Sequence, residues 1–205
     1  IYDLGPESHK KKQGTPTMGG LIFAVPSLIA AAAFAYNDTR FDYLLIVMLC
    51  ALGFGLVGFV DDFIKVKLKR SLGLTPKQKL IPQIVISIGL AFWAYFHPSI
   101  GSSLTVPFFN VEWNLGWFYI PVMVFILVGT VNSANLLDGL DGLCGGCSLF
   151  DFATMALICT ALAAANPDNA SNLLNVAIFS GAMVGALMGW VLSLFEKKVA
   201  PWRYK

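Results

Sequence analysis

Six long stretches of mainly apolar residues constrain the fold of this chain more than any other feature. They cover residues 19–36, 43–60, 80–97, 117–134, 148–165 and 173–195. A helix that crosses a bilayer needs about 20 mostly apolar residues. Each stretch is apolar all round rather than along one face, as expected for a helix in lipid. The sequence therefore predicts an all-α integral membrane protein, with about six transmembrane helices in a single domain over residues 1–205.

The composition supports this prediction. Hydrophobic residues make up 57% of the 205 residues and charged residues 13%, and the mean hydropathy is +0.70. A soluble domain carries roughly twice that share of charge, about a quarter of its residues. These values exclude a disordered chain, a collagen, a disulfide scaffold and an ordinary cytosolic enzyme. The net charge of +2 is too small to indicate a nucleic-acid partner.

The distribution of Lys and Arg predicts how the spans are oriented. If the first loop is cytoplasmic, the cytoplasmic segments are 1–18, 61–79, 135–147 and 196–205. These segments hold 13 of the 14 Lys and Arg residues, and only Arg40 lies on the other side. Such an excess is typical of cytoplasmic loops. On the opposite side, β-forming residues around Asn110 predict a short outer β-hairpin near 104–113.

The first cytoplasmic segment combines clustered cations with a glycine-rich turn. Lys10, Lys11 and Lys12 precede the run Gly-Thr-Pro-Thr-Met-Gly-Gly over residues 14–20. A helix start with glycines lets a phosphate approach the backbone N–H groups closely. A basic anchor at the membrane surface is the alternative, because basic runs beside a span commonly bind anionic lipid. The residues alone leave both interpretations open.

The second segment places two adjacent carboxylates, Asp61 and Asp62, at the end of an apolar span. Acidic residues at such a position are costly and are therefore functional candidates. A pair of aspartates suits Mg²⁺, which binds one or two carboxylates together with substrate phosphates. Crowding of two like charges also favours a general base. The alternative is a charged helix end, with Lys65 and the cations after it as a solvated rim.

The third segment has polar residues at every third position, namely Asn132, Asn135, Asp138 and Asp141. Helical residues three apart lie near one face, so these side chains predict a ligand or metal site. Hydrogen bonding between helices is the alternative, and it explains the asparagines better than the aspartates. All three segments lie on the predicted cytoplasmic side. Together they predict phosphate chemistry on a lipid-linked acceptor at that surface.

These motifs resemble those of the phospho-N-acetylmuramoyl-pentapeptide transferases, which belong to the polyprenyl-phosphate sugar-1-phosphate transferase superfamily. The resemblance runs from residue 1 to about residue 190. Its motifs are Ser8-His9 with Lys12 and the run at 14–20, Val-Asp-Asp-Phe at 60–63, and the Asn/Asp segment 132–143. Thr-Pro-Thr-Met-Gly-Gly is specific for these transferases, whereas the two aspartate motifs are shared across the superfamily.

The resemblance implies a fold of ten transmembrane helices, an active site on the cytoplasmic face of the bacterial inner membrane, Mg²⁺ dependence and a homodimer. The implied reaction belongs to peptidoglycan synthesis. It transfers phospho-MurNAc-pentapeptide from UDP-MurNAc-pentapeptide to undecaprenyl phosphate and gives lipid I and UMP. The implied partners are these two substrates and membrane lipid, with no nucleic acid.

The resemblance also implies roles for individual residues. The catalytic aspartates would be Asp61, Asp62 and Asp138, of which the first two are also the candidate Mg²⁺ ligands. The substrate-binding residues would be Lys12, Thr17, Lys65, Lys79, Asn132, Asn135 and Asp141. Which member of the Asp61–Asp62 pair is the base stays open, as does the choice between direct displacement and an aspartyl-phosphate intermediate.

The chain departs from the family pattern at both ends. The family's first transmembrane helix would precede Ile1. After Gly189 the family continues to a further Mg²⁺-binding aspartate and a histidine-rich loop, whereas residues 191–205 here read differently. We therefore expect a piece of a longer chain or a truncated product, for which an inactive membrane fragment is one alternative.

Two other functions are alternatives to the transfer of phospho-MurNAc-pentapeptide. A sister enzyme would transfer GlcNAc-1-phosphate from UDP-GlcNAc to the same lipid, and the Thr-Pro-Thr-Met-Gly-Gly run at 15–20 argues against it. A channel or transporter would carry polar residues near the bilayer midplane, whereas here they gather at one surface.

Overall fold

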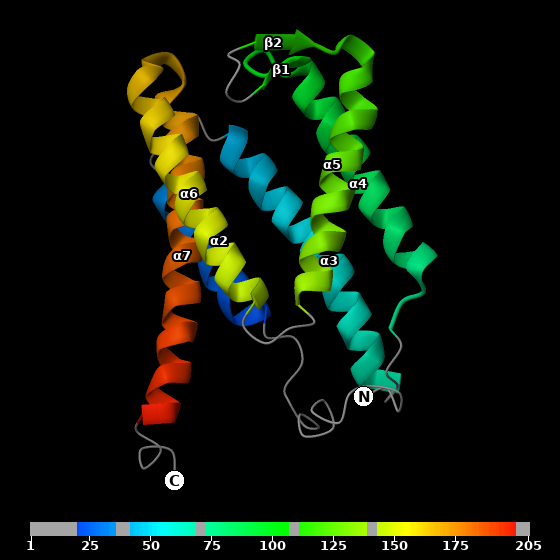
Figure 1. The fold of residues 1–205 in the computed structure, drawn as a ribbon, viewed down its shortest axis with the longest axis vertical. Helices are drawn as coiled ribbons and strands as arrows, with labels where there is room; N and C mark the ends of the chain where they lie inside the picture. The colour runs from blue at the N-terminus through cyan, green and yellow to red at the C-terminus, as the bar shows by residue number, and fades with distance from the viewer. Residues whose placement is uncertain (1–19, 36–41, 69–72, 107–110, 139–142, 200–205) are drawn as a thin grey trace. The chain divides into compact units, whose positions relative to one another are not determined.

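The structure is a computed structural model that describes residues 20–35, 42–68, 73–106, 111–138 and 143–199. It confirms an all-α protein with one small hairpin (Figure 1). The helices are α2 (Gly20–Ala35), α3 (Asp42–Leu68), α4 (Pro76–Phe96), α5 (Tyr119–Leu137), α6 (Leu143–Ala165) and α7 (Ala170–Val199). Short 3₁₀ turns, η1 (Gly116–Phe118) and η2 (Pro167–Asn169), precede α5 and α7.

Each of these helices overlaps one of the predicted spans. Within the described residues, five helical stretches are long and apolar enough to cross a membrane, and α2 contributes a shorter apolar segment, Ala24–Phe34. Several helices extend into predicted loops, because α3 continues through Asp61 to Leu68 and α4 begins at Pro76. Lys65 and Lys67 lie in the last turn of α3, where cations interact favourably with the helix dipole. The predicted sidedness of the spans stays a prediction.

The chain forms two compact units. The described part of the first unit runs from Cys50 to Leu136 and holds most of α3, then α4, the hairpin and most of α5. The second unit holds α2, the start of α3, α6 and α7; α6 and α2 both pack against α7. Its core is Ala31, Leu44, Phe179 and Met183.

The hairpin joins α4 to α5 at one end of the first unit (Figure 1). Its strands, β1 (Ser103–Val106) and β2 (Val111–Asn114), are antiparallel, with Ser103 opposite Asn114. The hairpin predicted near 104–113 is therefore confirmed. Gly101 and Gly116 flank it with φ angles of +69° and +51°, a conformation that glycine adopts without strain.

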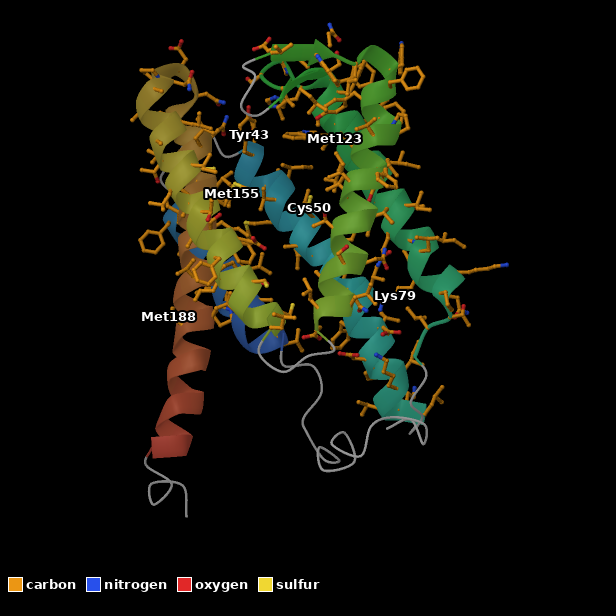
Figure 2. The ribbon with its side chains drawn as sticks, in the orientation of Figure 1. Tyr43, Cys50, Lys79, Met123, Met155 and Met188 are labelled. Atoms are coloured by element: carbon orange, nitrogen blue, oxygen red, sulfur yellow. The ribbon has the colours of Figure 1, made fainter. Side chains whose placement is uncertain are left out.

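The opposite end of α4 begins with a capping box. The Thr75 hydroxyl accepts the Gln78 N–H at 3.4 Å, and the Gln78 side chain accepts the Thr75 N–H at 3.0 Å. Pro76 occupies the first turn, where a missing N–H costs nothing. Such a cap stabilises a helix start by about 1 kcal/mol. It fixes the turn that carries Lys79, which Figure 2 labels.

Candidate functional site

Asp61 is the most enclosed charged group in the described part of the chain. It lies in the last third of α3 and is 6% exposed. Its Oδ1 accepts the backbone N–H of Leu74 at 2.7 Å. Its Oδ2 pairs with the ammonium groups of Lys65 at 2.7 Å and Lys79 at 3.5 Å. A buried carboxylate is costly unless it is paired and hydrogen-bonded, and these donors meet that requirement.

Asp62 has a different environment, although it is the next residue. Its side chain is 38% exposed, against 9% for the side chain of Asp61. It contacts Lys65, whose Nζ donates to Oδ1 at 3.0 Å. Lys65 therefore bridges the two carboxylates and offsets the repulsion between them. One aspartate of the pair is enclosed, and the other is open at the surface.

Lys79 connects the aspartate pair to α5. Besides its contact with Asp61, its Nζ donates to Asn135 Oδ1 at 2.8 Å. Residues from α3, α4 and α5 thus meet at one cation. The structure therefore brings together Asp61, Asp62, Lys65, Lys79 and Asn135, all of which were singled out in the sequence.

Asn132 lies one turn before Asn135 and pairs α5 with α4. Its Nδ2 donates to Gln83 Oε1 at 2.9 Å and to the Val128 carbonyl at 2.8 Å. Gln83 is 2% exposed. The amide NH₂ group of Asn132 therefore serves helix pairing, which is the alternative interpretation of this residue. Gln83 was not predicted, because a single Gln in an apolar span carries no periodic signal.

Gly73 and Leu74 also belong to the site and were not predicted. They lie in the turn before α4. A Cβ atom on Gly73 would overlap the Asp61 carboxylate and would lie 2.7 Å from the backbone carbonyl oxygen of Asp61. The only signal in the sequence was a turn followed by a helix start. Nothing in that signal indicates that the turn folds back onto Asp61.

The other predicted site residues are Asp138, Lys12, Thr17 and Asp141. Asp138 is exposed and directly follows α5, but it is grouped with the second unit. Lys12, Thr17 and Asp141 lie outside the described residues. Their predicted roles stay predictions.

The side chains at this cluster have the donor chemistry of an Mg²⁺ site. Among the described residues, no group of three or more His, Cys, Asp or Glu side chains is placed to hold a metal. Asp61 and Asp62 supply carboxylate oxygens, the ligands that Mg²⁺ prefers, and one or two of them suffice when phosphates and water complete the shell. The open carboxylate of Asp62 therefore fits such an ion.

An apolar groove of about 570 Å³ runs between α4 and α5 and reaches Asn132. Apart from this asparagine, its lining is hydrocarbon and glycine. The lining residues are Ile84, Ile88, Ile120, Pro121, Val124, Phe125, Val128, Gly129 and Asn132. Its lining includes no charged group that could meet a phosphate.

Comparison with known proteins gives two family matches. The model of glycosyl transferase family 4 matches residues 44–200, most of the chain. Signature 1 of the phospho-N-acetylmuramoyl-pentapeptide-transferases matches residues 12–23. The second match contains the Thr-Pro-Thr-Met-Gly-Gly run, so the resemblance found in the sequence is confirmed.

Curated relatives carry the same name, phospho-N-acetylmuramoyl-pentapeptide-transferase. The protein from Halalkalibacterium halodurans is 41% identical over 193 residues, or 94% of this chain and 56% of the relative. The one from Caldanaerobacter subterraneus is 43% identical over 93% of this chain and 56% of the relative. The Listeria monocytogenes protein is 41% identical over 98% and 58%. The chain thus spans just over half the length of these relatives.

Proposed function

Since this chain belongs to glycosyl transferase family 4, we propose that it carries out, or forms part of the enzyme that carries out, the transfer of phospho-MurNAc-pentapeptide from UDP-MurNAc-pentapeptide to undecaprenyl phosphate. The products are lipid I and UMP. The observation that carries this proposal is the match of the transferase signature to residues 12–23, supported by relatives of that name. The proposed place of reaction is the cytoplasmic face of the bacterial inner membrane.

The proposed chemistry is a phosphoryl transfer. An oxygen of undecaprenyl phosphate forms a bond to the sugar-linked phosphorus of the donor, and the bond from that phosphorus to the UMP oxygen breaks. Negative charge crowds this site, so positioned cations lower the barrier. Lys65 and Lys79 are such cations, and both are already oriented by Asp61.

Asp61 and Asp62 form the proposed Mg²⁺ site, in which the open carboxylate of Asp62 would contact the ion and the ion would neutralise part of the phosphate charge. The protein's own contribution is positioning: Asn135 and Asp61 hold Lys79 between them at 2.8 and 3.5 Å. Asp138 is the third proposed catalytic aspartate, and Lys12, Thr17 and Asp141 are proposed to contact the donor. Asn132 on α5 is proposed to bind substrate while its NH₂ group donates to Gln83.

The sister reaction, transfer of GlcNAc-1-phosphate from UDP-GlcNAc, stays the alternative. The description of the family model that matches residues 44–200 names no donor. The transferase signature favours the muramoyl donor, and a donor comparison decides between them.

The test is UMP release by the purified chain in lipid–detergent micelles. Undecaprenyl phosphate and Mg²⁺ are supplied with either UDP-MurNAc-pentapeptide or UDP-GlcNAc. Release with the muramoyl donor alone, lost on adding EDTA, supports the proposal. Release with UDP-GlcNAc alone assigns the sister reaction instead. No release from folded protein contradicts activity in this chain and supports an inactive fragment.

Asp62→Asn is the informative variant for this assay, and Asp42→Asn is its matched control. Asp42 is the first residue of the same helix and lies at its other end. Loss of release in the first variant, with release kept in the second, ties the activity to the aspartate pair. Equal loss in both variants would argue that the helix, not the site, was damaged.

A further inference from the structure

We propose that the backbone at Gly73 and Leu74 forms a cradle that holds Asp61 in place, and that Asp62 is the aspartate that meets the phosphate-bearing ligand. Gly73 and Leu74 are then positioning residues, and the two aspartates have separate tasks. The identity of the ligand rests on the proposed function. The cradle itself rests on geometry.

The first step is the donor set of Asp61. A carboxylate offers about four lone-pair positions, and the described structure directs three donors at this one. One of these donors is the backbone N–H of Leu74, which lies 2.7 Å from Oδ1. Because this N–H belongs to the main chain, it cannot rotate away as a side chain can. Asp61 would have to break several charge-assisted contacts to reach a ligand.

The second step is the fit of Gly73. A Cβ atom here would overlap the Asp61 carboxyl group and approach its backbone carbonyl oxygen to 2.7 Å. The carbonyl belongs to α3 and cannot move without bending the helix. Any side chain at this position therefore forces the turn off Asp61. Gly58, one turn earlier in α3, has nothing within 4 Å of its Cβ position.

The third step is the connection from the cradle to the start of α4 and to Lys79. Leu74 directly precedes the cap residue Thr75, so the positive end of the α4 dipole lies at the Asp61 carboxylate. Lys79 follows on the first turns of α4 and contacts both Asp61 and Asn135. The cradle therefore sets the position of the Lys79 cation relative to α3 and α5.

The fourth step is the contrast with Asp62. Its side chain is 38% exposed and pairs with Lys65. Lys65 has Asp61 as a second partner at 2.7 Å, so it can stay in place when Asp62 turns to a ligand. Asp62 can thus bind Mg²⁺ or a phosphate-bound ion at the cost of a single ion pair.

The test is carboxyl footprinting of the full chain in detergent micelles. A water-soluble carbodiimide with glycine ethyl ester labels accessible carboxylates, and tandem mass spectrometry separates Asp61 from Asp62. In the wild type we expect Asp62 to be labelled at least about fivefold faster than Asp61, because the charge-assisted contacts of Asp61 shield it. Millimolar Mg²⁺ with UDP-MurNAc-pentapeptide should slow labelling of Asp62 and leave Asp61 unchanged. Equal rates in the wild type, or protection of Asp61 instead, would overturn the proposal.

Three variants sharpen the test. Gly73→Ala should raise Asp61 labelling to within about twofold of Asp62, since the cradle is displaced. Gly58→Ala should leave the wild-type ratio. Leu74→Ala should also leave it, because the donor is a backbone N–H. An unchanged ratio in Gly73→Ala, or a changed ratio in Leu74→Ala, contradicts the cradle. If Gly73→Ala does not fold, the wild-type ratio and Leu74→Ala still decide.

The kinetic readout separates positioning from general damage. In active protein, Gly73→Ala should lower kcat by about tenfold or more with the donor KM within about threefold, as expected when a catalytic group is displaced and binding is kept. An unchanged kcat in Gly73→Ala overturns the positioning role. Footprinting needs no turnover, so a chain that releases no UMP contradicts the proposed activity of this chain while the labelling ratio still tests the cradle.

Discussion

The two ends of the α4–α5 pair are held together in different ways. At the hairpin end, Tyr95 stacks on Trp117 with ring centroids 5.1 Å apart, and Phe96 meets the same indole edge-on at 6.4 Å. At the other end, Lys79 donates to Asn135 and Asn132 donates to Gln83. At one end the contacts between α4 and α5 are between aromatic rings, whereas at the other they are hydrogen bonds between specific atoms.

This difference between ring contacts and hydrogen bonds indicates which end of the helix pair is suited to the proposed chemistry. Aromatic contacts stabilise a helix pair by about 0.5–1.5 kcal/mol each and tolerate substitution by other apolar groups. Buried polar contacts must be desolvated, and they stabilise little unless every partner is present. The hairpin end also has hydrogen bonds, such as Ser102 Oγ to Asn114 Oδ1 at 2.8 Å, but they lie at the base of the hairpin. At the other end, the hydrogen bonds join α4 to α5 through side chains of the proposed site. The predictions below test this contrast, beginning with the largest effect.

Loss of a carboxylate at the polar end should have the largest effect. We expect Asp61→Asn, Asp62→Asn and Asp138→Asn each to lower turnover by about 10³-fold or more in the active enzyme, as removal of preorganised charge does. UMP release measures this, with Asp42→Asn as control. A near-normal rate in any one variant would remove that residue from the catalytic set.

Lys79→Met should come next. The side chain is 20% exposed and bridges Asp61 and Asn135, so methionine keeps most of its length but loses both contacts. We expect a loss of about 10²-fold in turnover, since a cation near the phosphates is removed. The neighbouring Lys77 is exposed, and Lys77→Met should stay close to the wild type. Equal losses in the two variants would show that general positive charge, not this bridge, matters.

Gln83→Leu should have a smaller effect, on both stability and turnover. Leucine leaves the Asn132 NH₂ group with only the Val128 carbonyl, at a cost of about 1–2 kcal/mol. Because Asn132 is then less well oriented, turnover should fall by about tenfold. Ser87→Ala is the matched control. Its buried hydroxyl donates to the Gln83 backbone carbonyl, so it should lower the unfolding temperature without changing turnover. A turnover loss in Ser87→Ala equal to that in Gln83→Leu would contradict the orienting role.

Much of this arrangement could be predicted from the sequence. The helices follow from the long apolar runs, because a helix satisfies its backbone polar groups internally in lipid. The hairpin follows from β-forming residues around Asn110. The grouping of Asp61 with Asn135 follows from the assignment of their two polar segments to one side of the spans, since the ends of neighbouring helices on one side lie close together. Lys79 was a candidate only through the family resemblance.

Other features could not be predicted, for physical reasons. The contact of Leu74 with Asp61 joins residues 13 apart through a turn, and turn signals specify local conformation but not the group that the turn meets. Gln83 gave no signal, because periodicity indicates which face a residue occupies and not which side chain lies opposite. The extension of α3 to Leu68 was missed because charged residues were assigned to a loop, whereas Asp61 and Lys65 pair at a spacing of four along the helix.

The smallest effect should come from the aromatic end. Tyr95→Leu removes the ring that contacts Trp117 and Tyr119 but keeps an apolar side chain. We expect a loss of about 0.5–1.5 kcal/mol in stability, which lowers the unfolding temperature by a few degrees at most for a chain of about 200 residues. Turnover should stay within about twofold, since no polar contact at the other end is touched. Tyr95→Phe keeps the ring and should restore the unfolding temperature. A turnover loss in Tyr95→Leu as large as that in Lys79→Met would show that the two ends are coupled, and the division between a structural end and a functional end would then be wrong.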